Sequence, residues 1–388
     1  MTARRGLSSL NLTFLGTASA QPSLTRNHSA LALRLNSDVW LFDCGEATQH
    51  QIQRSQVKMG KIEKIFITHT HGWDHIFGLL PLLASMLNGA GGTADGVEDP
   101  RTHMVQDSLD PIEIYGPFGT RAYVRNGLKH THTLLGAPYV VHELRLPSDP
   151  PDGDHNLHAS ESPTGRNIPQ TNGVWSDVYR DSIISVSAAP ILHSVPCIGY
   201  VVTEAPIPGK MDPAKYIPHL KRTKTPMSAM SRLQQGESME LSDGTMLHGP
   251  LKRPGRKLVI LGDTYDPSPI AELASSADLL IHEATNAHLP ALDSNTKAED
   301  TFESVEARTK ARGHSTPQMA GAFAARIGAK QLVLNHFSPR YPGNDDVDPT
   351  AKTIMEGIAH LAEEHYSGKI TCARDFMSFN VDVTQESA

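Results

Sequence analysis

The sequence predicts a layered α/β fold, and two observations carry this prediction. Short apolar runs rich in β-branched residues alternate with helix-like segments through most of the 388 residues. Polar residues then stand where several of these runs end, as Asp263 does after "LVILG" and His336 after "LVLN". In α/β folds the carboxyl ends of neighbouring strands meet at one edge of the sheet, and functional residues gather there.

The N-terminal half begins with three β-like runs, which predict an antiparallel meander: Leu10–Gly16, Ser29–Leu35 and Val39–Gly45. Glu63–His69 is a further apolar, β-rich run. Ile76–Leu87 follows as a predicted helix, with Pro81 within its first two turns, where proline is tolerated.

The second half repeats this style. The runs "SIISVSAAPILH", "IGYVVTE", "RKLVILGDT", "ADLLIHEAT" and "KQLVLNHFS" are predicted strands, and "TPQMAGAFAARIG" is a predicted helix. Three segments have the composition of surface loop insertions, namely residues 88–109, 148–181 and 290–312. No repeat of fixed period interrupts the chain, so residues 1–388 are treated as one domain with insertions.

Composition restricts the class of protein. Hydrophobic residues make up 39% of the chain, but no apolar run approaches the roughly 20 residues that a membrane-spanning helix needs. We therefore expect no membrane partner. The N-terminal stretch lacks a long apolar segment, which argues against a signal peptide. Cys44, Cys197 and Cys372 lie far apart, which favours a reducing compartment, cytoplasmic or nuclear, with mitochondria not excluded.

The densest chemical motif is "THTHGWDH", which spans residues 68–75. It places His69, His71, Asp74 and His75 at a strand-to-helix junction, where a loop turns several side chains inward. Imidazole nitrogens and carboxylate oxygens are ligands that zinc prefers. The alternative, a histidine-rich surface loop, does not explain this spacing.

Three further ligand candidates end other strands: His193 in "APILHSVPC", Asp263 in "LVILGDT" and His336 in "LVLNHFS". Taken singly, each is more often a structural histidine or a turn-forming aspartate. Together with the His-x-His motif they supply the ligand types that a two-zinc site needs.

The ordered motifs "THTHGWDH", "ILHSVPC", "LGDT", "IHEAT", "GHSTPQMA" and "NHFSPRY" resemble the metallo-β-lactamase superfamily. More narrowly, the chain is similar to the short form of ribonuclease Z, the tRNA 3′-endonuclease family. "TFLGTASAQPSLTRN" near the N-terminus and "KITCARDFM" near the C-terminus extend this resemblance over about Leu12 to Met377. It implies a four-layer αββα sandwich with a protruding flexible arm.

The resemblance also implies roles. His69, His71 and His193 would hold one zinc ion, Asp74, His75 and His336 a second, and Asp263 would bridge the two. Such a pair supplies hydroxide near neutral pH for attack on a phosphodiester. Asp74 would orient the nucleophile, His314 of "GHST" would protonate the leaving oxygen, and Glu283 of "HEAT" would orient His314. The alternative for His314 is a residue that merely precedes a helix cap at Ser315–Thr316.

A basic segment is the predicted RNA-binding arm. Residues 205–257 hold ten Lys and Arg against four Asp and Glu, whereas the whole chain has a net charge of −7. Lys and Arg grip phosphates without reading sequence. The candidate contacts on the arm are Lys210, Lys221, Arg222 and Lys224, and Arg26 and Arg340 are further candidates. A solvated insertion is the alternative. A homodimer is implied by the resemblance only.

The leading hypothesis is therefore a zinc-dependent endoribonuclease that removes the 3′ trailer of precursor tRNA and leaves a 3′-hydroxyl. The alternatives are another hydrolase of this fold that acts on a phosphodiester or small ester, or a tRNA-binding paralogue with an impaired second metal site. Trp73, one residue more than the best-known form of the motif contains, is the feature that supports the paralogue. We interpret Trp73 as a one-residue bulge that leaves Asp74 and His75 in place.

Overall fold

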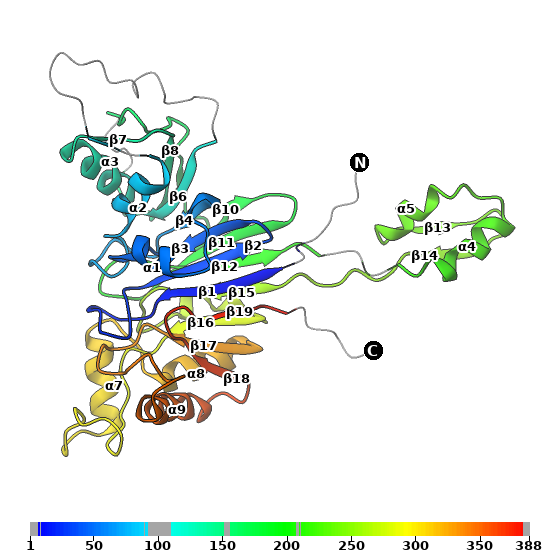
Figure 1. Cartoon of the computed structure of the whole chain (residues 1–388). Helices are drawn as coiled ribbons and strands as arrows, with labels where there is room; N and C mark the ends of the chain where they lie inside the picture. Colours follow the sequence, from blue (N-terminus) through cyan, green and yellow to red (C-terminus); the bar gives the residue numbers. More distant parts are fainter. Residues whose placement is uncertain are drawn as a thin grey trace, which may run out of the picture.

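The computed structural model describes residue 7 and the ranges 9–88, 90–91, 110–150, 156–206, 209 and 211–382. Two β-sheets pack face to face, and helices cover the outer face of each sheet (Figure 1). This is the predicted αββα layering. None of the helices in the described ranges is long and apolar enough to cross a membrane.

The first sheet has eight strands in the order β19-β1-β2-β3-β4-β6-β8-β9. Its strands are β1 (Leu10–Gly16), β2 (Ala30–Leu35), β3 (Asp38–Phe42), β4 (Ile62–Phe66), β6 (Ile112–Pro117), β8 (Tyr139–Arg145), β9 (Asn167–Pro169) and β19 (Ser378–Asn380). The first three form the predicted antiparallel meander. From β3 to β9 the pairing is parallel, so the carboxyl ends of β4 and β6 face the same edge.

The second sheet has seven strands in the order β10-β11-β12-β15-β16-β17-β18. They are β10 (Trp175–Arg180), β11 (Ile184–Ile191), β12 (Cys197–Glu204), β15 (Lys257–Ile260), β16 (Leu279–Glu283), β17 (Gln331–Asn335) and β18 (Lys369–Cys372). The last four strands are parallel, which brings the residues after β15, β16 and β17 together at one edge.

Alternating side chains divide the interior into three layers of core. Phe14, Phe66 and Tyr200 belong to the core between the sheets. Helices α1 (Thr48–Arg54), α2 (Leu79–Met86) and α3 (Thr120–His130) pack on the outside of the first sheet. Helices α6 (Ala271–Ala274), α8 (Pro317–Ile327) and α9 (Pro349–Glu363) cover the second. Strands buried on both faces explain the near-continuous apolar runs of the sequence.

The helix predicted at Ile76–Leu87 begins three residues later, as α2, at Leu79. The backbone just before α2 is hydrogen-bonded to the loop that follows β3. Cys44 N–H donates to the carbonyl of His75, and Gly78 N–H donates to the carbonyl of Cys44. These bonds replace the first helical turn, and they fix the chain just after the metal-ligand motif.

All three segments expected to be loops carry some regular structure, including β5 (Ala90–Gly91) in residues 88–109. Residues 148–181 contribute β9 and β10 to the two sheets, and Trp175 is buried in the central core. Residues 290–312 contain α7 (Phe302–Ala311), which starts with a capping box at Thr301. The polar composition concealed these elements, because edge strands and surface helices bury only a few side chains. Most of the third segment, 88–109, lies outside the described residues.

The basic segment forms a small lobe that projects from the sheets (Figure 1). It contains α4 (Pro213–Arg222), α5 (Ala229–Gln234), β13 (Ser238–Glu240) and β14 (Met246–His248). Its own small core consists of Leu220, Ala229, Leu233, Leu241 and Leu247. β5 (Ala90–Gly91) and β7 (Thr133–Leu134) form a separate two-stranded sheet. We call residues 205–257 the arm.

A buried ion pair holds the base of the arm. Arg256 Nε and Nη2 donate to the two carboxylate oxygens of Glu204 at 2.8 and 2.9 Å. The Arg256 guanidinium also donates to the carbonyls of Val381 and Leu7. Arg256 is 4% exposed and Glu204 2%. The bidentate pair therefore ties the end of β12 and the start of β15 to both ends of the described chain.

Candidate metal centre and active site

The predicted ligands come from four different strand ends and meet at one edge of the two sheets. His69 and Asp74 follow β4, His193 follows β11, Asp263 follows β15 and His336 follows β17. Two groups of these residues present ligand atoms that all lie within 4.8 Å of one another. The groups are Asp74, His75, Asp263 and His336, and His69, His193 and Asp263.

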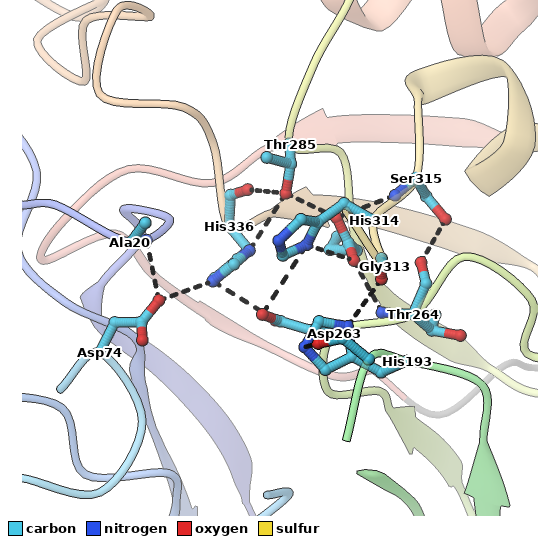
Figure 2. A network of polar contacts seen from close by, with 12 residues as sticks. Ala20, Asp74, His193, Asp263, Thr264, Thr285, Gly313, His314, Ser315 and His336 are labelled. Carbon is cyan, nitrogen blue, oxygen red and sulfur yellow. Dashed lines mark hydrogen bonds and ion pairs between the residues drawn. The ribbon is translucent and has the colours of Figure 1, made fainter. Parts of the chain in front are cut away.

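The first group is buried and tightly convergent. The Nε2 atoms of His75 and His336 lie 3.1 Å apart, and each lies 3.3 Å from Oδ1 of Asp263. Asp74 completes the group, with its Oδ2 3.5 Å from Nε2 of His336 (Figure 2). Two imidazoles and two carboxylates around one point form a donor set that suits zinc.

The second group shares Asp263 through its other oxygen. Nε2 of His69 lies 3.9 Å from Oδ2 of Asp263, and the rings of His69 and His193 are 5.2 Å apart between centroids. Because Oδ1 faces the first group and Oδ2 the second, Asp263 stands where a carboxylate bridging two cations would stand. This position agrees with the role that the resemblance implied.

His71 stands apart from both groups. Its side chain is exposed, and its ring centroid lies 6.4 Å from that of His193. Gly72, the next residue, has a φ of +76°, a left-handed conformation that glycine adopts at little cost. The predicted ligands are therefore brought together except for His71, and Asp74 and His75 reach the second site despite the longer loop.

Hydrogen bonds to Nδ1 leave Nε2 of the ligand histidines facing the centre. His69 Nδ1 lies 3.0 Å from the Thr68 hydroxyl, His193 Nδ1 lies 2.8 Å from the Gly313 carbonyl and His336 Nδ1 lies 3.2 Å from the Thr285 hydroxyl. His75 Nδ1 lies 2.7 Å from Oδ2 of Asp43. Metal-binding histidines are held by outer partners of this kind.

Asp43 makes three hydrogen bonds at the site. Its Oδ1 accepts the backbone N–H of Thr68 at 2.7 Å, and its Oδ2 accepts both the Thr68 hydroxyl and the His75 ring. Asp43 itself has a φ of +59°, a left-handed conformation uncommon for residues other than glycine. The strained turn after β3 thus aims one carboxylate at the strand and the loop that carry the ligands.

The carboxylates of the site are held in the ionised form that a metal ion binds. Burial alone would raise the pKa of Asp263, but the facing rings of His336, His75 and His69 lower it well below its ordinary value. Asp74 behaves alike: burial raises its pKa, and His336 and His75 outweigh burial and lower it. Burial lowers the pKa of His69 strongly, so that ring is neutral and able to bind metal. The residues present therefore fit a zinc pair.

His314 and Glu283 form a hydrogen-bonded pair beside the candidate ligands. His314 Nδ1 lies 3.1 Å from Oε1 of Glu283 and 3.8 Å from Oδ2 of Asp263. Burial lowers the pKa of His314, but the Glu283 and Asp263 carboxylates outweigh burial and raise it to about 9. Glu283 is fixed in turn by the N–H groups of Thr264 and Ser315 and by the Thr285 hydroxyl. His314 is therefore a protonated group held at the site.

Curated relatives match nearly the whole chain. The bovine and human (Bos taurus and Homo sapiens) proteins named zinc phosphodiesterase ELAC protein 1 are each 37% identical and cover 97% of this chain and 99% of their own length. A ribonuclease Z of Prochlorococcus marinus (strain MIT 9313) is 34% identical over 96% of this chain and 98% of its own.

This chain belongs to the ribonuclease Z family. The crystal structure of human tRNase Z, short form, agrees, with a TM-score of 0.60, 31% identity and coverage of 96% of this chain and 100% of that one. The metallo-β-lactamase fold protein YhfI from Bacillus subtilis, at 15% identity and a TM-score of 0.54 over 96% of this chain and 100% of its own, shares the fold. A family model described as anti-Pycsar protein Apyc1 matches residues 10–89 only. The predicted family and fold are confirmed.

One predicted contact is wrong for this ribonuclease Z. Arg26 is 1% exposed, and its guanidinium lies in the core. It donates to the carbonyls of Tyr341, Ala373 and Pro342 and to the Thr17 hydroxyl, and it stacks over the Phe337 ring at 4.5 Å. Burial lowers its pKa to about 10. Arg26 therefore fixes the loop that follows His336 and has no face left for a phosphate.

The other candidate contacts differ in their surroundings. Arg340 is half-buried and pairs with Asp293, with its Nε 3.2 Å from Oδ2. Lys221, Arg222 and Lys224 are exposed on the arm of this ribonuclease Z, and Arg222 also pairs with Asp243. Lys210 lies outside the described residues. A contact with RNA stays a prediction for these five residues.

Sequence reasoning missed several residues that shape the site. The Thr285 hydroxyl donates to Glu283 at 2.6 Å and contacts His336, so it links Glu283 to one of the candidate ligand groups. Its place in "IHEAT" was the available signal. Ala20 donates its N–H to Oδ2 of Asp74 at 2.8 Å (Figure 2). No side-chain pattern signals such a backbone contact.

Proposed function

We propose that this chain is a zinc-dependent endoribonuclease that removes the 3′ trailer of precursor tRNA and leaves a 3′-hydroxyl on the tRNA, with two zinc ions per chain. Membership of the ribonuclease Z family supports the reaction type, the hydrolysis of an RNA phosphodiester. One observation supports it most: two convergent ligand groups share Asp263, and the protonated His314 lies beside them.

Asp74, His75 and His336 would hold one ion, His69 and His193 the other, and Asp263 would touch both. Zinc at such a site supplies a water that ionises near neutral pH and charge that opposes the phosphate. The Ala20 N–H holds one oxygen of Asp74 and so keeps that carboxylate aimed at the centre. We also propose that His71 binds the ion held by His69 and His193, for which its exposed side chain would have to move inward.

His314 would act as the proton donor to the leaving O3′ of the tRNA. Its raised pKa keeps the imidazolium protonated at neutral pH, and its Nδ1 is already used by Glu283, which leaves Nε2 for the substrate. Glu283 would orient His314 and stabilise its charge. That Asp74 and His75 reach the second group supports an enzyme over a binding paralogue with an impaired site.

The arm would bind the body of the tRNA by its positive charge. Lys221 and Lys224 are exposed on or just after α4, far along the lobe from the sheets (Figure 1). Phosphate contacts of this kind give affinity that falls steeply with salt. Arg222, Lys210 and, near the site, Arg340 would add to them.

The arm points away from the metal centre of its own chain. β12 begins at Cys197, beside the ligands, and ends at Glu204, where the arm starts; β15 leads back from Lys257 toward Asp263. Eight residues of strand span about 26 Å, and the lobe extends farther in the same direction (Figure 1). This geometry supports a homodimer in which each arm serves the partner's site.

The compartment would be the cytoplasm or the nucleus, where tRNA precursors occur in a reducing medium. All three cysteines are unpaired, and Cys44 and Cys197 are buried. Imaging of a tagged chain tests this part of the proposal, and accumulation in a secretory compartment would contradict it.

The main test incubates purified protein and zinc with a precursor tRNA that carries a 3′ trailer. Cleavage that leaves a tRNA 3′-hydroxyl is expected, and its absence under conditions where a control ribonuclease Z cuts would refute the proposal. Replacing residues 209–252 by a short linker should abolish this cleavage and spare hydrolysis of bis(p-nitrophenyl) phosphate, because only the large substrate needs the arm. Loss of both reactions would contradict the role given to the arm.

A mixing experiment tests the dimer. Protomers that lack the arm are combined with protomers that carry His314→Ala, and neither alone should cut precursor tRNA. Restored cleavage is expected if an arm serves the partner's site, because the mixed dimer then joins one intact arm to one intact site. No recovery in a mixture shown to contain mixed dimers would mean that each arm serves its own chain.

A further inference from the structure

Trp73 is an exposed aromatic residue inside the metal-ligand loop. It stands between His71 and Asp74, and 48% of its surface is exposed. The other two tryptophans of the chain, Trp40 and Trp175, are 3% and 2% exposed and belong to the core between the sheets. The half-exposed indole therefore presents an aromatic face to solvent next to the candidate ligand Asp74.

The indole is held in a fixed position. Its Nε1–H donates to the carbonyl of Ala20, and its backbone carbonyl accepts the N–H of Glu46 at 2.9 Å. Ala20 has a φ of +57°, and the same residue donates its N–H to Asp74. One residue in a left-handed conformation thus braces both the ligand and the tryptophan. A ring that is held in this way binds a flat partner at little entropic cost.

Trp73 lies on the side of the centre away from His314. Asp74 and Ala20 lie at one end of the polar network, and His314, Gly313 and Ser315 lie toward the other, with His336 between them (Figure 2). If His314 protonates the O3′ that stays on the tRNA, the tRNA end lies at His314. The trailer, which keeps the scissile phosphate on its 5′ end, then extends toward Asp74 and Trp73.

We propose that Trp73 stacks on the base of the first trailer nucleotide and so forms a subsite for single-stranded RNA beside the metal centre. This inference rests on the proposed function. Exposed aromatic rings bind successive bases of single strands without regard to sequence, because every base has a π-face. The subsite would hold trailers of any sequence and draw the strand across the ligands.

Two variants and two substrates distinguish stacking of Trp73 on the trailer base from a role in holding Ala20 and Asp74 in place. Trp73→Phe keeps a ring but removes the donor to Ala20, and Trp73→Ala removes both. Each is assayed on a precursor tRNA and on the same RNA with an abasic first trailer nucleotide. We expect Trp73→Ala to lose about tenfold in kcat/KM on the normal substrate and little on the abasic one. Trp73→Phe should retain most of the activity on the normal substrate.

The matched control is Val347→Ala, which removes another exposed apolar side chain, 78% exposed and outside the ligand groups. It should cut both substrates at the wild-type rate. Equal losses on the normal and abasic substrates for Trp73→Ala would show that the residue only braces Ala20 and Asp74, and would overturn the proposal. The proposal would also be overturned if the effect of Trp73→Ala disappeared with an abasic discriminator nucleotide instead of an abasic trailer nucleotide. That result would place the stacked base on the tRNA side of the scissile phosphate.

Fluorescence gives a readout besides activity. Because Trp40 and Trp175 are buried, a change in tryptophan emission on mixing with precursor tRNA, recorded before the first turnover, reports mainly on Trp73. Quenching is expected with the normal substrate and not with the abasic one or with Trp73→Phe. If wild-type protein quenches but does not cut, the proposed function fails and this subsite survives; if it cuts without quenching, the subsite alone fails.

Discussion

His75 and His336 come from opposite sheets, and their Nε2 atoms lie 3.1 Å apart. Each nitrogen is also 3.3 Å from the same oxygen of Asp263. The other ring nitrogen of each histidine is already bonded, so both Nε2 atoms are left to face Asp263. The contact between the two sheets therefore gathers the residues of one candidate metal group.

Replacing His336 with alanine should lower the zinc content from two ions per chain to one, since the two ligand groups share only Asp263. Elemental analysis of protein dialysed against a weak chelator measures this. The cleavage of precursor tRNA should fall with the zinc content. Full retention of both ions would show that His336 is not a ligand.

His69→Ala and His71→Ala should differ, although the sequence motif treats the two histidines alike. His69 is 1% exposed and lies in a ligand group, whereas His71 is exposed and outside both groups. We expect the larger loss of zinc from His69→Ala, measured by competition with a chromophoric chelator. Equal losses would mean that the loop folds His71 inward when metal binds.

Asp43→Asn should weaken zinc binding about 10- to 100-fold without removing a ligand. The carboxylate holds both Thr68 and the His75 ring, and an amide has a single acceptor oxygen with which to replace it. Chelator competition gives the affinity, and circular dichroism checks that the fold is kept. An unchanged affinity would show that the ring of His75 is oriented by the metal alone.

Glu283→Gln should move the alkaline limb of the pH–rate profile to lower pH by about one unit. His314 loses its proton as the pH rises through its raised pKa, and the Glu283 carboxylate is the first of the groups that raise it. Removing that charge lowers the pKa, so the protonated donor is lost earlier. The measurement is kcat against pH at saturating substrate, with zinc content as control. If the alkaline limb does not move, it reports the titration of a group other than His314.

Arg256→Ala should destabilise the fold by about 3–5 kcal/mol, because it leaves Glu204 buried and unpaired. Urea unfolding measures the change. Arg253→Ala is the matched control, since Arg253 is exposed three residues away and its loss should change stability by less than about 0.5 kcal/mol. Similar stabilities for the two variants would mean that the pair does not anchor the arm.

The sequence by itself determined the fold class, the family and the candidate ligands, of which all but His71 converge. Strand-like runs that end in Asp263 and His336 and the spacing of "THTHGWDH" are local patterns, and the order of motifs identifies the family. Segment composition also located the arm. These features are readable because each depends on residue type at a fixed position along the chain.

Only the tertiary structure decided how these residues act together. It placed Arg26 in the core, where its guanidinium donates hydrogen bonds to carbonyls of distant segments. It also showed strands and a helix in segments whose composition predicts loops. It left His71 outside the ligand groups and gave Trp73 a fixed, exposed position through Ala20. The physical reason is that burial, ring orientation and backbone hydrogen bonds depend on which distant segments meet, and residue spacing carries no information about that.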